Sequence, residues 1–240
     1  MIICEHVSFS YEKDRPVLRD LTFRIAKGES VGLIGANGAG KSTLMKVLLG
    51  LQFASGRVLV GGTPVEKATL PQIRRKLGYV LQNSDNQMFM PTVYEDMTFG
   101  LLNYGMSRQA AEERVDAVLA QLGLTELKHR YNHRISGGEK RMAAIATVLA
   151  MEPEALLMDE PCSALDPCNR RIVIDTIRSL PQTRIITSHD LDMILDTCQR
   201  VILLSGGEIR ADGPADVILR DRALLEANHL ELPLCLAGRE

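Results

Sequence analysis

Residues Gly35 to Ser42 read Gly-Ala-Asn-Gly-Ala-Gly-Lys-Ser and fit the phosphate-binding loop pattern G-x-x-x-x-G-K-[ST] at every fixed position. The apolar run 30–34 precedes the loop and a helix-like stretch, 43–49, follows it. Glycines let consecutive backbone N–H groups turn inward, and with a helix N-terminus these groups form a cradle for anions. The pattern therefore predicts that the chain binds a nucleoside triphosphate.

The loop also carries side chains that can act on the phosphates. We expect Lys41 to reach the β- and γ-phosphates and Ser42 to bind Mg²⁺. The residues expected to surround the nucleotide here are Gly35, Asn37, Gly38, Ala39, Gly40, Lys41, Ser42 and Thr43.

Two adjacent carboxylates follow the apolar run Leu156 to Met158. A buried strand that ends in an aspartate places that carboxylate beside the Mg²⁺ of a phosphate-loop site, so Asp159 is a candidate metal ligand. Glu160, one residue on, is a candidate general base that orients water toward the γ-phosphate. A solvated strand end or a helix N-cap is the alternative, which the upstream phosphate loop disfavours.

Ser136-Gly137-Gly138-Glu139 is a capping box that predicts a helix start. Two glycines in the first turn are poor helix formers, and they make sense if the backbone must approach something closely. Exposed N–H groups, a hydroxyl and the positive end of the helix dipole would form a second anion site here. One chain would then carry two γ-phosphate sites, which suggests that two chains share each nucleotide.

His189 follows the apolar stretch Arg184 to Thr187, within Ser-His-Asp. A position at the end of another core strand favours a side chain that faces the nucleotide pocket. The three adjacent residues cannot form the geometry of a hydrolase triad.

Hydrophobic patterning predicts the elements that position these residues. Alternation in 2–4, 7–11 and 21–25 indicates antiparallel strands with one buried face. Short apolar runs at 79–81, 155–158 and 184–187 are typical of buried parallel strands, and 57–60 and 201–204 enter turns. From 92 to about 127 the pattern is helical. We therefore expect an α/β fold: a parallel core, an antiparallel β flank and a helical insertion.

The amino-acid composition and the net charge limit the kinds of function that the chain can have. The 240 residues are 45% hydrophobic with a net charge of −2, so we expect a substantial core and no nucleic-acid face. Five cysteines without C-x-x-C spacing indicate free thiols. No apolar run approaches the ~20 residues of a membrane span, so a partner would have to supply one.

Together these residues resemble the ATP-binding-cassette (ABC) ATPases over essentially the whole chain. Gly35–Ser42 resembles the Walker A loop, Leu156–Asp159 the Walker B strand, and Glu160 the catalytic glutamate. Other matches are the signature motif at 136–139, the D-loop at 163–166, Gln82 as the Q-loop glutamine, His189 as the switch histidine and Tyr11 as the aromatic residue that stacks on adenine. The resemblance implies a RecA-like P-loop core with an antiparallel β subdomain and an inserted α-helical subdomain.

Three positions depart from the family pattern. Glu139 replaces the commoner Gln of the signature, Ile135 the commoner Leu, and Cys162 stands where Thr or Ser is usual before the D-loop. None removes a phosphate or metal ligand, so we expect activity to survive.

A finer resemblance lies after the Q-loop. Residues 82–89, 92–96 and 99–100, with 230–234 near the C-terminus, are similar to the ATPase subunits of energy-coupling-factor importers, which include cobalt and nickel uptake systems. This implies an ATP-hydrolysing motor for a transition metal ion or a vitamin, with the cargo chosen by another protein. A soluble ABC ATPase not coupled to transport, or an ATP-dependent interaction subunit, are the alternatives.

The resemblance also implies partners and boundaries. Two ATPs with Mg²⁺, the latter held by Ser42, Gln82 and Asp159, would lie between two ATPase chains, identical or related. Catalysis would involve Lys41, Gln82, Glu160 and His189. Integral membrane subunits would dock near residues 83–99, which places the chain at the cytoplasmic face of the membrane. We expect an ATPase domain over 1–220, with a helical subdomain at about 92–150, and a short tail over 221–240.

Overall fold

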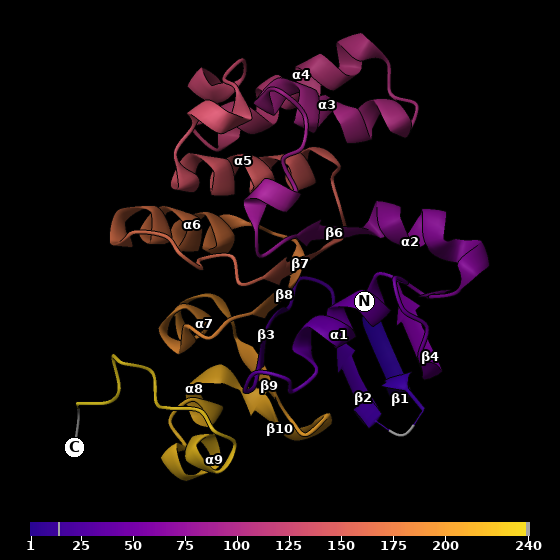
Figure 1. Ribbon diagram of the computed structural model, residues 1–240, viewed down its shortest axis with the longest axis vertical. Helices are drawn as coiled ribbons and strands as arrows, with labels where there is room; N and C mark the ends of the chain where they lie inside the picture. The colour runs from indigo at the N-terminus through magenta and orange to yellow at the C-terminus, as the bar shows by residue number, and fades with distance from the viewer. Residues whose placement is uncertain (14, 239–240) are drawn as a thin grey trace.

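The structure is a computed structural model that describes residues 1–13 and 15–238, and its elements form two sheets and surrounding helices (Figure 1). The larger sheet has the order β10-β9-β3-β8-β7-β6. Its strands β9, β3, β8, β7 and β6 pair in parallel, and β10 is antiparallel to β9. Their bounds are β3 Ser30–Ile34, β6 Leu77–Val80, β7 Ala155–Asp159, β8 Thr183–Thr187, β9 Arg200–Ser205 and β10 Glu208–Pro214.

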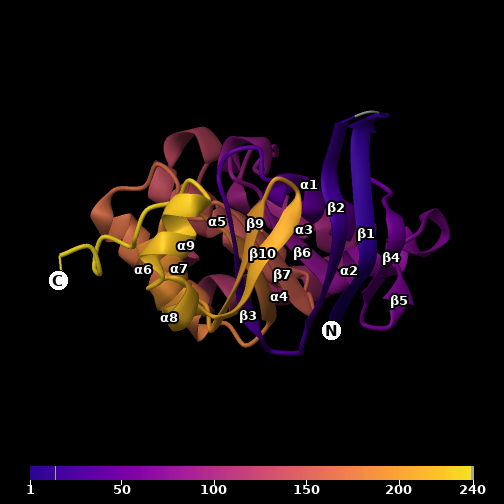
Figure 2. The same cartoon turned by 90° about the horizontal axis from the view of Figure 1, so that it is seen from below.

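The smaller sheet is antiparallel and has the order β2-β1-β4-β5. It lies on the opposite side of the molecule from α6 and α7 (Figure 2). Its strands are β1 Ile2–Glu12, β2 Arg15–Ile25, β4 Ser55–Val60 and β5 Thr63–Pro64.

Apart from α1 and α2, the α-helices fall into three groups (Figure 1). One group, α3, α4 and α5, forms a separate layer beyond β6 and β7, while α6 and α7 flank the larger sheet and α8 and α9 lie near its β9–β10 edge. Their bounds are α1 Lys41–Leu48, α2 Leu70–Lys76, α3 Val93–Asn103, α4 Arg108–Gln121, α5 Gly137–Ala150, α6 Pro167–Ser179, α7 Leu191–Thr197, α8 Ala215–Ile218 and α9 Arg222–Ala227. Short 3-10 helices are η1 Lys67–Thr69, η2 Ser84–Asn86, η3 Thr125–Leu127 and η4 Asn132–Arg134.

The larger sheet separates two hydrophobic cores. Along β7, Leu156 and Met158 pack into the core shared with α3–α7, whereas Ala155 and Leu157 pack into the core shared with α1 and the smaller sheet. Successive strand residues point to opposite faces, so a strand covered on both faces is apolar throughout. This burial holds the carboxyl ends of β3, β7 and β8 rigidly at one edge.

The predicted parallel core with an antiparallel flank is confirmed, with corrections of detail. The helical pattern over 92–127 is interrupted, because α3 ends at Asn103 and α4 begins only after its N-cap, Ser107. The strand expected at 21–25 starts earlier, at Arg15, because its first half pairs with the end of β1. The pattern did not predict α2 or α7, whose seven residues are too few for a clear helical period.

The stretch 92–150, predicted as an inserted helical unit, contains α3, α4 and α5. The predicted tail, 221–240, includes α9, and its residues 239 and 240 lie outside the described part of the chain. Among the described residues, none of the helices combines the length and apolar character that crossing a membrane requires.

Candidate functional site

The phosphate-loop residues form a tight turn between β3 and α1. Gly35 has φ of +150°, and a Cβ there would lie 2.2 Å from the backbone oxygen of Leu204, so only glycine fits. The ammonium group of Lys41 folds back over the loop and donates hydrogen bonds to the oxygens of Gly35, at 2.6 Å, and Ala36, at 3.1 Å. The loop backbone is therefore preformed around the lysine.

A cavity of about 370 Å³ opens beside this loop. It brings together predicted residues from four places in the sequence: the phosphate loop, the end of β6, the end of β7 and the start of α7. The lining is Val17, Asn37, Gly38, Ala39, Gly40, Lys41, Ser42, Thr43, Gln82, Asp159, Glu160 and His189. Parallel strands deliver their C-terminal residues to one edge, which is where open α/β sheets bind ligands.

Tyr11, predicted to stack on a base, does not line this cavity but lies next to Thr43, which does. Its side chain is exposed, and its hydroxyl lies 3.4 Å from Oγ1 of Thr43 in α1. The Tyr11 ring packs edge-on against Phe9, with ring centroids 4.8 Å apart. An exposed ring held in this way leaves a face open to a planar ligand.

Asp159 is held by two residues that the sequence did not single out. Oγ1 of Thr187 donates to Oδ1 of Asp159 at 2.5 Å, and the Tyr79 hydroxyl donates to Oδ2 at 3.1 Å. Burial raises the pKa of Tyr79, and the charge of Asp159 raises it further, so the phenol stays protonated and donating. Both partners come from strands next to β7, and only the strand order reveals them.

Glu160 has an unusual backbone and a defined set of partners. Its φ is 49°, in the left-handed region that costs energy for residues other than glycine. Its Oε2 accepts hydrogen bonds from the backbone N–H of His189, at 3.2 Å, and from the hydroxyl of Ser188, at 3.3 Å. Its Oε1 is buried, has no hydrogen-bond partner among the described residues and lies 3.7 Å from Nε2 of His189.

The charged groups of the cavity influence one another. Burial raises the pKa of Glu160, and the hydrogen bond from His189, the nearby imidazole, Ser188 and the charge of Lys41 oppose that rise. Burial lowers the pKa of Lys41, and the carboxylates of Glu160 and Asp159 oppose that change. A lysine opposite two carboxylates suits a ligand that brings both negative charge and a cation.

The side chains predicted to hold a metal are all hard oxygen donors. Ser42, Gln82 and Asp159 line the same cavity and offer a hydroxyl, an amide oxygen and a carboxylate. Mg²⁺ prefers such oxygens and usually takes only a few from the protein. The donor set therefore fits Mg²⁺.

The glycine-rich segment at 136–138 lies elsewhere. Ser136 caps α5 as predicted: its hydroxyl accepts from the N–H of Glu139, and Oε2 of Glu139 accepts from the N–H of Ser136 at 2.7 Å. The lining of the phosphate-loop cavity does not include residues 136–138. A different cavity is bordered by Gln82, Asn83, Ser84, Asp85, Ile135, Gly137, Lys140, Arg141, Ser163, Ala164 and Leu165. Within one chain, the structure does not bring the two predicted phosphate sites together.

Gln82 borders both cavities, and the segment after it is fastened to α5. The guanidinium of Arg141 donates to the backbone oxygens of Leu81, at 2.7 Å, and Gln82. The side chain of Gln87 accepts from the N–H of Leu81 and donates to the oxygen of Ala144. Because of these bonds, the Gln82 segment is positioned by α5, a link that the sequence alone did not indicate.

Cys162, where the family pattern has Thr or Ser, is buried. Burial raises the pKa of its thiol to about 11, so the group is neutral at physiological pH. A small neutral side chain of this kind fits the buried position, and that activity survives the replacement stays a prediction.

Known proteins resemble this chain along most of its length. A family described as ABC transporter matches residues 18–163. The energy-coupling factor transporter ATP-binding protein EcfA of Methanothermobacter thermautotrophicus is 41% identical over 239 residues, with 97% of this chain and 77% of the relative covered. The cobalt import ATP-binding protein CbiO of Rhodobacter capsulatus is 39% identical over 242 residues, with 98% and 86% covered.

Among solved structures, CbiO1 of Clostridium perfringens, described as part of the ABC transporter complex cbiONQ, superposes with a TM-score of 0.83 at 30% identity. The match covers 94% of this chain and 93% of that one. Relatives of higher identity carry names that go no further than ABC transporter ATP-binding protein.

Proposed function

This chain belongs to the ABC transporter family and is an ATP-binding ATPase subunit, and on that premise we propose that it drives a membrane importer of the energy-coupling-factor type. The cargo we propose is a transition metal ion, cobalt or nickel, or a vitamin. The names of EcfA and CbiO support this proposal, as does the similarity over residues 82–100. The chain would work at the cytoplasmic face of the membrane.

The observation that carries the catalytic part is the convergence of Lys41, Asp159, Glu160 and His189 on one cavity. Lys41 would offset charge on the γ-phosphate, and Glu160 would orient the attacking water and accept its proton. His189, 3.7 Å from the free Oε1 of Glu160, would contact the γ-phosphate. Tyr11 would stack on the adenine.

Mg²⁺, when bound, would neutralise negative charge on the phosphates. Ser42, Gln82 and Asp159 would hold it, and Thr187 and Tyr79 would fix the orientation of the Asp159 carboxylate.

The second part of the proposal is a site shared between two ATPase subunits. The separate position of 136–138 supports it, since these residues do not line the phosphate-loop cavity of their own chain. Each ATP would lie between the phosphate loop of one subunit and Ser136, Gly137 and Gly138 of the other. The partner subunit is either a second copy or a related chain.

A surface on α3 supports contact with membrane subunits. Phe89 and Phe99 are 62% and 43% exposed and pack edge-to-face, with ring centroids 5.1 Å apart. Next to them lies a cavity of about 340 Å³, which Met90, Tyr94, Thr98, Phe99 and Leu102 help to line. Exposed apolar groups that cluster in this way mark interaction sites. The nearby Gln82 segment would link this surface to the nucleotide.

The proposal is tested by co-expressing the chain with its neighbouring genes and reconstituting the membrane proteins that co-purify with it. We expect proteoliposomes to take up labelled Co²⁺, Ni²⁺ or one vitamin when ATP is supplied. Uptake should fail with Glu160→Gln and should fall with Phe99→Ser, which leaves basal ATPase activity intact. Val217→Ser, at another exposed apolar residue, is the matched control.

Two results would overturn the proposal. An active ATPase that co-purifies with no membrane protein and supports no uptake after reconstitution would favour a soluble ABC ATPase. ATP binding without turnover by the wild-type chain would favour an interaction subunit.

A further inference from the structure

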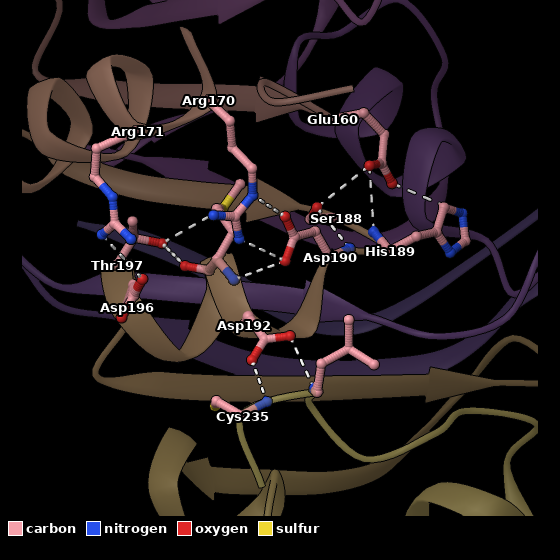
Figure 3. A network of polar contacts seen from close by, with 12 residues as sticks. Glu160, Arg170, Arg171, Ser188, His189, Asp190, Asp192, Asp196, Thr197 and Cys235 are labelled. Atoms are coloured by element: carbon pink, nitrogen blue, oxygen red, sulfur yellow. Dashed lines mark hydrogen bonds and ion pairs between the residues drawn. The ribbon is translucent and has the colours of Figure 1, made fainter. Parts of the chain in front are cut away.

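An ion pair behind the cavity connects α6 to the loop that carries His189. Nε of Arg170 donates to Oδ2 of Asp190 at 2.6 Å, and its NH2 group donates to Oδ1 at 3.0 Å (Figure 3). Both side chains are roughly two-thirds or more shielded, with 27% and 31% of their surface exposed. Two parallel hydrogen bonds of this kind fix geometry as well as charge.

Asp190 has a second function in the same place. It is the N-cap of α7, where Oδ1 accepts a hydrogen bond from the N–H of Met193 at 2.9 Å. The backbone N–H of Asp190 donates to Oγ of Ser188 at 3.0 Å. The conformation of residues 188–190, here called the histidine loop, is therefore fixed by groups that Asp190 supplies.

The histidine loop in turn holds Glu160. The hydroxyl of Ser188 and the N–H of His189 both donate to Oε2 of Glu160, as Figure 3 shows. A continuous set of hydrogen bonds thus runs from Arg170 through Asp190 and Ser188 to Glu160. The set leaves Oε1 of Glu160, which accepts no hydrogen bond from the described residues and lies 3.7 Å from Nε2 of His189, as the oxygen able to accept a hydrogen bond from water.

The helix that carries Arg170 is itself well anchored. Asp166 caps α6 and accepts hydrogen bonds from the N–H groups of Cys168 and Asn169 at 2.9 and 3.0 Å. Arg170 follows one turn later, and Val173, Ile174 and Ile177 bury the inner face of the helix. The guanidinium therefore projects from a rigid support.

We propose that Arg170 is a positioning residue for ATP hydrolysis, which holds the histidine loop against Glu160 by gripping Asp190. The proposal rests on the role given above to Glu160. Without Arg170, Asp190 can still cap α7, so the helix remains, but its carboxylate is free to turn and the loop loosens. The donors to Glu160 then shift, and the carboxylate samples orientations that do not align water.

The test compares Arg170→Gln and Arg170→Lys with Arg171→Gln. Arg171 is the neighbouring exposed arginine, whose closest carboxylate oxygen, on Asp196, is 3.9 Å away. We expect Arg170→Gln to lower kcat for ATP hydrolysis by between about tenfold and a hundredfold, since small misplacements of a reacting group have effects of this size. KM for ATP should change less than about twofold, because no phosphate-loop group is touched. Arg170→Lys should recover part of kcat, and Arg171→Gln should match the wild type.

A second measurement needs no catalysis. Hydrogen exchange of the His189 and Asp190 amides should be faster in Arg170→Gln than in the wild type and unchanged in Arg171→Gln, because both N–H groups are donors in the set. The double variant Arg170→Gln/Asp190→Asn should lose no more kcat than the more damaging single variant, since both remove one contact.

Some outcomes would overturn the proposal. A normal kcat in Arg170→Gln, in a protein that Glu160→Gln inactivates, would refute the role of Arg170 and leave the proposed function standing. Equal losses of kcat in Arg170→Gln and Arg171→Gln would point to a general defect of α6. Full activity of Glu160→Gln would instead refute the assignment on which both rest.

Discussion

Gly138 at the start of α5 lies directly against Asn169 at the start of α6. A Cβ on Gly138 would approach the Asn169 side chain to 2.2 Å, whereas a Cβ on Gly137 would meet nothing within 4 Å. The two glycines of the capping box therefore differ in the space that surrounds them. A larger residue at position 138 would have to displace the side chain of Asn169, whereas Gly137 borders open space.

This difference gives opposite expectations for two alanine variants. Gly138→Ala should lower the free energy of unfolding, measured by urea denaturation, by up to about 1 kcal/mol relative to Gly137→Ala, because the side chain of Asn169 has to move. Gly137→Ala should leave that free energy unchanged or slightly higher, yet weaken ATP-dependent dimers, because the partner's phosphate would approach this backbone. Equal stability of the two variants would contradict the packing argument.

Glu160→Gln tests the general base. The amide keeps the size of the side chain and can still accept hydrogen bonds, but it cannot take a proton from water. We expect ATP turnover to fall at least about a hundredfold, with ATP affinity retained and a dimer trapped. Glu154→Gln, at an exposed glutamate just before β7, is the matched control. Turnover near the wild-type rate in Glu160→Gln would remove Glu160 from this role.

Lys41→Ala tests the phosphate cradle. The variant removes an ammonium group opposite the phosphates and leaves the oxygens of Gly35 and Ala36 without their donor. ATP affinity, measured by calorimetry, should fall by roughly a hundredfold, since hydrogen bonds to charged groups are worth a few kcal/mol. Lys46→Ala, at an exposed position on the same helix, should bind normally. Equal affinity in both variants would contradict the cradle.

Ser136→Arg tests the shared site. A bulky cation at the start of α5 should block ATP-driven dimers in gel filtration, although the phosphate loop of the same chain is untouched. Ser107→Arg removes a comparable N-cap from α4 and controls for the loss of capping. If Ser136→Arg still forms dimers with ATP, each chain must complete its site alone.

The capping box at α5 predicts a pH dependence of stability. The hydrogen bond from the N–H of Ser136 lowers the pKa of Glu139 in the folded chain below its unfolded value of about 4.3. A depressed folded pKa means that the ionised carboxylate stabilises the fold above the unfolded pKa, and that this stabilisation is lost as pH falls through the folded pKa.

We therefore expect Glu139→Gln to be less stable than the wild type by about 0.5 kcal/mol near neutral pH, the typical worth of a charge at a helix N-terminus. The difference in thermal midpoint should shrink as the pH is lowered toward about 4. Glu126→Gln, an exposed glutamate outside the box, should show no such trend. A difference that grows on acidification would refute the argument.

The sequence was sufficient for features that depend on local chemistry. Spacing identified the phosphate loop around Lys41, the carboxylates at the end of β7 and the cap of α5, because a short motif fixes backbone and side chain together. It also indicated the parallel core, since strands buried on both faces are apolar throughout.

Residues whose role depends on contacts with partners distant in the sequence could not be predicted in the same way. Thr187 and Tyr79 reach Asp159 only because β8 and β6 flank β7 in the sheet, an order that periodicity does not encode. Arg170 and Arg141 look like ordinary surface cations in the sequence. Their importance arises from contacts with partners 20 and 60 residues away along the chain.

The separation of the phosphate loop from residues 136–138 within one chain also has a consequence for a newly synthesised subunit. In the proposed arrangement, a single subunit can bind ATP at its phosphate loop. It lacks the residues 136–138 of a partner subunit that would complete the ATP site. If the partner is a second copy, the rate of ATP hydrolysis would then rise with the square of the subunit concentration when subunits are scarce. Assembly itself would act as the safeguard against idle hydrolysis.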